Sequence, residues 1–258
     1  MRLYWKYFTI HLKSVMQYKG SFFATVIGSF FTSFSVFLGI FFMFQRFHTV
    51  AGFNYEEVLL CYGIMLMGFS IAQMFASGFK VFAGMIANGE FDRILCRPRN
   101  EIFQVLAFRV DFVRIGALLQ GAVMLIYGLV SCPVDWTFLK ICTVLFMVTG
   151  GAVLFSALFL LDGAIAFFTL QGLEFMNVFT YGAVEHGKYP LGIYGKGMLT
   201  FCTFVIPYAL VQYYPLLYVL GRSSSLGYAF LPLAACLFVV PCWIVWRVGV
   251  RKYKSTGS

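Results

Sequence analysis

Charged side chains are scarce in this sequence. Lys and Arg number 19 and Asp and Glu 10, which is 11% of 258 residues, whereas 61% are apolar and the mean hydropathy is +0.85. A soluble domain is about 25% charged and about 45–50% apolar, so this chain has too little polar surface for a water-soluble globule. The composition excludes a soluble enzyme, a disordered chain and a nucleic-acid-binding protein, and it indicates an integral membrane protein.

The sequence also lacks the motifs of catalysis and metal binding. Its only Gly-Lys pairs begin at Gly187 and Gly195, and neither is followed by Ser or Thr, as a phosphate-binding G-x-x-x-x-G-K-[ST] loop requires. The three histidines lie far apart, and the seven cysteines include no C-x-x-C pair. This pattern argues against a histidine metal site and a disulfide framework. We expect a chain that is not an enzyme and holds no cofactor or metal of its own.

The first 20 residues are basic throughout and contain no compact apolar core, which argues against a cleavable signal peptide. The polar positions recur at helical spacing: Arg2, Lys6, Thr9, Lys13 and Gln17. This spacing predicts an amphipathic helix over 1–20 that lies on the cytoplasmic leaflet of the bilayer. The alternative is an irregular positive leader to the first span.

Seven stretches are apolar and long enough to cross the bilayer: 22–44, 58–78, 115–132, 141–161, 164–184, 198–220 and 226–246. If 198–220 enters from outside and returns, 14 basic residues lie inside and five outside, and both termini are cytoplasmic. Keeping 164–184 inside instead gives 16 to three, so charge alone does not decide. We prefer the first arrangement because Pro207 and Pro215 disfavour a continuous helix. The prediction is an all-α membrane protein with six transmembrane helices in one domain, 1–258.

The cytoplasmic loop 79–114 is the most polar part of the chain. Gly89 predicts a helix break, Asn100 predicts the N-cap of a new helix, and Pro98 predicts extended backbone at Arg97. Charges of both signs surround apolar residues here: Glu90, Phe91, Asp92, Arg93, Ile94, Leu95, Arg97, Pro98 and Arg99. One interpretation is that the arginines only set the topology. The other is a docking surface, because an apolar centre inside a charged rim is typical of a specific protein interface.

The run GEFDRILCRPRN at 89–100 resembles the cytoplasmic segment of type 2 ABC-transporter permeases, which are six-span membrane subunits of ABC exporters. The remaining matches follow in the same order along the chain: Tyr189-Pro190-Leu191, Ile206-Pro207, Tyr214-Pro215, Leu220-Gly221 and the basic tail from Arg251 to Ser258. The similarity covers almost the whole chain.

The resemblance implies a permease subunit that forms a translocation pathway as a dimer in the cell inner (cytoplasmic) membrane. The second permease subunit is identical or homologous, and two separate ATP-binding subunits carry ATP and Mg and dock on Glu90 to Arg99. The resemblance also implies short re-entrant helices on the outer side before the last span. The alternative function is an ATP-independent channel or secondary carrier, for which an internal repeat with paired broken helices would be typical.

Polar residues recur along one side of the predicted fifth span: Gln171, Glu174, Asn177 and Tyr181. Such residues line a translocation path or form hydrogen bonds between helices, and both interpretations stay open. Asp162 is expected at a solvated inner turn between the fourth and fifth spans.

Small residues recur along one side of the first span: Ala24, Gly28, Thr32, Ser35 and Gly39. A row of small residues lets helix backbones approach closely, so this face is expected to pack against a helix of this chain or of a second copy.

Overall fold

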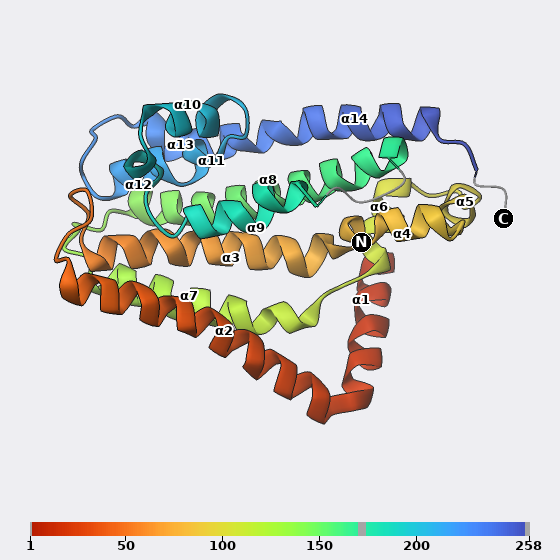
Figure 1. Ribbon diagram of the computed structural model, residues 1–258, viewed down its shortest axis with the longest axis horizontal. Coiled ribbons are helices and arrows are strands. Elements are labelled where there is room, and N and C mark those ends of the chain that lie inside the picture. Colours follow the sequence, from red (N-terminus) through yellow and green to blue (C-terminus); the bar gives the residue numbers. More distant parts are fainter. Residues whose placement is uncertain (1, 170–173, 256–258) are drawn as a thin grey trace.

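A computed structural model describes residues 2–169 and 174–255, and their regular elements are helices joined by loops, with one isolated bridge between Val50 and Phe53. The long helices run side by side along the longest axis of the molecule (Figure 1). The start of α1, the short helices α4 and α5 and the end of α14 all lie toward one end of this axis. We call it the coupling end.

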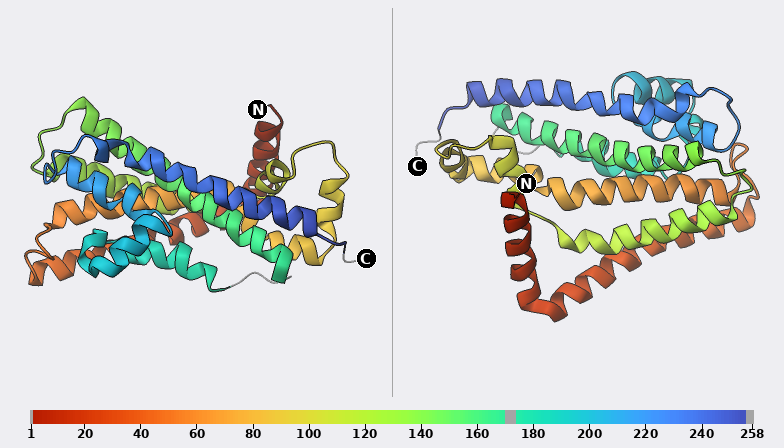
Figure 2. Two further views of the ribbon diagram at one scale, coloured as in Figure 1. Left: turned by 90° about the horizontal axis from the view of Figure 1, so that it is seen from above. Right: turned by 180° about the vertical axis from the view of Figure 1, so that it is seen from behind.

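The N-terminal helix stands apart from the bundle direction. α1 (Arg2–Val15) and η1 (Met16–Tyr18) precede α2 (Lys19–Arg46), and the backbone of Tyr18 leaves the helical region at φ −114° and ψ 62°. The chain therefore bends, so that α1 crosses the bundle direction steeply in Figures 1 and 2. Of the helix predicted over 1–20, the part Arg2–Val15 is confirmed as an α-helix, and its position on the bilayer surface stays a prediction.

α3 (Tyr55–Lys80) is the central helix and packs against α7 (Ile115–Ser131) and α8 (Phe138–Thr169). A capping box of Asn54 and Glu57 begins it. The helices approach closely at Gly128, where a Cβ atom would lie 2.9 Å from the Cα of Leu60. Of the most apolar window of α3, 83% is buried, against 6% for the first helical span. α2 therefore lies at the edge, on α7 and η2 (Phe112–Arg114).

The predicted boundary between the fourth and fifth spans is wrong. α8 continues through Asp162 to Thr169, so the spans 141–161 and 164–184 do not match two separate helices. Gly163 is not a turn residue. It lies where α8 packs on α3, since a Cβ there would come within 3.2 Å of the carbonyl oxygen of Phe79.

α9 (Met176–His186) runs back along α8, and its 11 residues extend about 16 Å, roughly half the thickness of a hydrocarbon core.

Three short helices gather at the opposite end of the bundle: α10 (Lys196–Phe204), α11 (Tyr208–Val211) and α12 (Tyr213–Val219). The chain bends by 87° between 196–204 and 208–219. It reaches them through η3 (Leu191–Tyr194) and returns through α13 (Gly227–Ala235), η4 (Cys236–Phe238) and α14 (Val239–Lys252).

Among the described residues, five helices are long and apolar enough to cross a membrane, or six if the bent pair is one span. The all-α membrane class is therefore confirmed. The re-entrant path of 198–220 and the cytoplasmic position of both termini stay predictions.

Candidate translocation groove and coupling segment

The loop 79–114 folds into three short helices, which we call the coupling segment: α4 (Phe82–Ala87), α5 (Glu90–Leu95) and α6 (Glu101–Phe108). Gly89 joins α4 to α5 with φ +68°, a left-handed conformation that favours glycine. The side chain of Asn100 accepts hydrogen bonds from the backbone nitrogens of Ile102 (2.9 Å) and Phe103 (3.3 Å). The break at Gly89 and the N-cap at Asn100 are both as the sequence predicts.

The predicted docking residues divide into two groups. The side chains of Arg93, Leu95, Arg97, Pro98 and Arg99 are exposed, and those of Glu90 and Asp92 are half-buried. Phe91 is 0% exposed, so the prediction that it belongs to a docking surface is wrong. Its ring packs on those of Phe82, Tyr253 and Phe167, with centroids 5.0, 5.1 and 5.3 Å away. The sequence alone assigns Phe91 to the apolar centre of the docking surface, because in so short a helix the pattern of apolar residues does not show which of them face the interior.

The C-terminal part of the chain clamps the coupling segment. Arg247 of α14 forms an ion pair with Glu101 of α6 at 3.3 Å, and the hydroxyl of Ser255 donates to the Asp92 carboxylate at 2.6 Å. Burial and the nearby Asp92 carboxylate raise the pKa of Tyr253 to about 12. The residues after α14 therefore contact α5, and α14 itself contacts α6.

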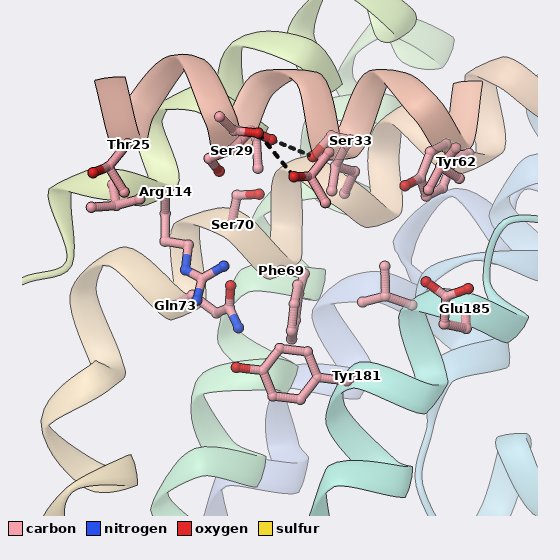
Figure 3. A pocket seen from close by; sticks show the side chains of 17 residues that line it. Thr25, Ser29, Ser33, Tyr62, Phe69, Ser70, Gln73, Arg114, Tyr181 and Glu185 are labelled. Carbon is pink, nitrogen blue, oxygen red and sulfur yellow. Dashed lines mark hydrogen bonds between the residues drawn. The ribbon is translucent and has the colours of Figure 1, made fainter. Parts of the chain in front are cut away.

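A groove of about 490 Å³ lies between α2, α3, α9 and the start of α7 (Figure 3). Its labelled polar lining comes from four elements: Thr25, Ser29 and Ser33 of α2, Tyr62, Ser70 and Gln73 of α3, Arg114 of η2, and Tyr181 and Glu185 of α9. Glu185 is bonded to Lys188 one turn away. The walls include apolar side chains such as Leu66 and Phe69. The groove therefore offers polar contacts and an apolar wall to one molecule.

Of the three predicted path residues that the structure describes, only Tyr181 lines this groove. Glu174 and Asn177 are exposed and lie outside its lining, and Gln171 lies outside the described residues. The hydroxyl of Tyr181 accepts a hydrogen bond from Lys80 at the end of α3, and the Lys80 nitrogen lies 4.4 Å from the Tyr181 ring centroid. Asp162 is half-buried in α8 and is not a loop residue, which corrects its predicted place.

The predicted small face of the first span is exposed in the described part of this chain. Ala24, Gly28, Thr32, Ser35 and Gly39 are all exposed. A Cβ at Gly28 or Gly39 would meet nothing within 4 Å. Gly28 and Thr32 line the groove. The predicted contact of this face with another helix therefore stays a prediction.

Sequence reasoning missed a polar stripe on α3 and the role of Arg114. Ser70, Gln73, Ser77 and Lys80 follow one another at spacings of three, four and three residues, which places them on one side of a helix. That spacing was readable from the sequence. Arg114 lies directly before the third span, and the sequence alone indicates only a role in setting the membrane topology. Its place in the groove depends on the packing of helices that are far apart in the sequence.

The family model of the ABC-2 family transporter proteins matches residues 30–257, and so includes the coupling segment and most of the groove. The chain belongs to this family. Comparisons with curated proteins and with solved structures returned no match. An ABC-2 membrane chain is a permease and not a catalytic domain, so this chain is a multi-pass membrane transport protein. The resemblance seen in the sequence is confirmed.

Proposed function

We propose that this ABC-2 chain is the permease subunit of an ABC exporter and that the groove is one half of its translocation pathway. The observation that carries the proposal is the open groove beside α2, because Gly28 and Thr32 of the exposed small face line it. A second permease subunit, identical or homologous, closes the groove. The pair sits in the cell inner (cytoplasmic) membrane.

Two ATP-binding subunits, which hold ATP and Mg, dock on the coupling segment. Support comes from the exposed side chains of Arg93, Leu95 and Arg97, which leave an apolar contact between charges at the coupling end. When nucleotide binding closes these subunits, they push α5, and the contacts of Phe91 carry the push to α8 and α14. Lys80 links the same end of α3 to Tyr181 in the groove. The coupling is a mechanical bias between inward-facing and outward-facing states.

The test reverses exposed charges on the coupling segment and leaves the contacts of Arg247 and Ser255 with this segment unchanged. In an Arg93→Glu/Arg97→Glu variant, we expect normal insertion but loss of ATP-binding subunits on co-purification and loss of ATP-driven transport. Lys196→Glu, an exposed reversal at the opposite end, is the matched control and should change neither. Unchanged co-purification in the double variant would contradict the docking assignment. Transport by the purified chain in ATP-free liposomes would favour the alternative, a channel or secondary carrier.

A further inference from the structure

The part of the groove nearest the coupling end holds hydrogen-bond donors that have no partner among residues 2–169 and 174–255. Gln73 is 3% exposed and its Nε2 atom has no hydrogen-bond acceptor there, and Ser70, which is 1% exposed, lines the same groove. Arg114 uses only Nε, which lies 3.2 Å from Asp111 Oδ2, and both Nη atoms stay free. Figure 3 shows these side chains together at one part of the groove. A buried donor without a partner is costly, so the arrangement points to a ligand that accepts hydrogen bonds.

The depth of these donors matches the inner headgroup level of a bilayer. The Phe8 ring of α1, the helix expected on the membrane surface, lies 5.0 Å from the Phe112 ring and 6.5 Å from the Phe75 ring. Arg114 and Gln73 are each two residues from those contacts. Gln73 also lies seven residues, about 10 Å, before the end of α3. A lipid-like molecule in the inner leaflet would present its headgroup at this level.

The donor set selects a headgroup of one charge type. The planar fork of an arginine fits two oxygens of a phosphate or carboxylate, and the amide and hydroxyl donors add further contacts. Among the described residues, each carboxylate beside the groove has a basic partner: Asp111 pairs with Arg114, and Glu185 pairs with Lys188. Beyond the donors, Phe69, Leu66 and Val36 supply an apolar wall.

We propose that the groove binds an amphiphile whose oxyanionic headgroup is held by Arg114, Gln73 and Ser70 and whose apolar tail lies along Phe69 and Leu66. This assignment names the substrate class of the proposed pathway and rests on that function for its role as cargo. Binding itself requires only the permease chain.

The test measures binding of dodecyl phosphate to the full chain in phosphatidylcholine nanodiscs. Three competitors separate the sources of affinity: inorganic phosphate lacks the tail, dodecyl maltoside lacks the charge, and dodecyltrimethylammonium reverses it. We expect that none of them displaces dodecyl phosphate at equal concentration. Displacement by dodecyl maltoside or dodecyltrimethylammonium would overturn the headgroup assignment. Displacement by inorganic phosphate would show that the site binds a free anion, and would overturn the assignment of an amphiphile as the ligand.

Variants test the named donors. Gln73→Leu and Arg114→Gln should each weaken binding by about tenfold or more, the loss expected for a hydrogen bond to a charged group. Arg114→Lys keeps the positive charge but loses the planar fork, so we expect this variant to fold and to bind dodecyl phosphate weakly. It therefore tests the site even if Arg114→Gln fails to fold. The matched control is Gln120→Leu, a 2% exposed glutamine with an unpartnered oxygen outside the groove lining. Equal affinity of Gln73→Leu and Gln120→Leu would overturn the proposal. Intact binding of dodecyl phosphate without ATP-driven transport would overturn the proposed function and would leave the assignment of the binding site unchanged.

Discussion

Replacing Phe91 by Ala should detach α5 from the bundle. The ring is fully buried and packs on Phe82, Tyr253 and Phe167 with centroids 5.0–5.3 Å away. Removing a buried phenylalanine ring costs about 3–5 kcal/mol through lost burial and the cavity left behind. Since α5 is a short helix held by this side chain, we expect much of that loss as local opening of the coupling segment.

Hydrogen–deuterium exchange of the detergent-solubilised protein measures this opening. Amides of α5 should exchange at least about a hundredfold faster in Phe91→Ala, which is what about 3 kcal/mol implies. Leu95→Ala is the matched control, because Leu95 lies on the same helix but is 45% exposed. It should leave exchange nearly unchanged and weaken only the association with ATP-binding subunits. Equal protection of α5 in both variants would refute the view that Phe91 anchors the helix.

Three further changes test the packing around the groove and its two ends. Gly78→Ala should lower stability by about 1–3 kcal/mol in thermal unfolding, because a Cβ there overlaps the carbonyl oxygen of Val105, whereas Gly84→Ala, with open space around it, should not. A smaller loss for Gly78→Ala than for Gly84→Ala would contradict the close crossing of α3 and α6. The raised pKa of Tyr253, about 12 against an ordinary 10.0, means that its contribution to stability is complete below pH 10 and disappears as pH rises through 12. Tyr253→Phe should flatten that part of the stability curve, and an unchanged curve would refute the assignment. Gln212→Leu removes a fully buried amide that donates to two backbone carbonyls after α9, at 2.8 and 3.0 Å, and should cost about 1–3 kcal/mol for each unpaired carbonyl. Unchanged thermal unfolding would show that these bonds contribute nothing.

The sequence predicted those elements whose signals are local. Apolar length predicted α2, α3 and α7 to within a few residues, and backbone chemistry predicted the break at Gly89 and the cap at Asn100. Hydropathy wrongly predicts a turn at Asp162, because an acid followed by a glycine interrupts the apolar pattern in the same way in a turn and in a helix packed against a neighbour. The distinction depends on what approaches Gly163, which is a property of α3.

The groove was predictable only in part for the same reason. A helical spacing rule groups residues on one helix, and of the residues that it selected, Gly28, Thr32 and Tyr181 line the groove. Helical spacing does not predict that α9 lies beside α3. The sequence alone therefore assigns Lys80 to the cytoplasmic loop and does not predict its contact with Tyr181. The two groups meet because α2 packs chiefly along α7 and η2, with few contacts to α3, and the groove that Arg114 and Gln73 share lies between α2, α3 and α9. A site assembled from four helices is therefore determined by the splay of α2, and that splay is set by packing between residues far apart in the chain.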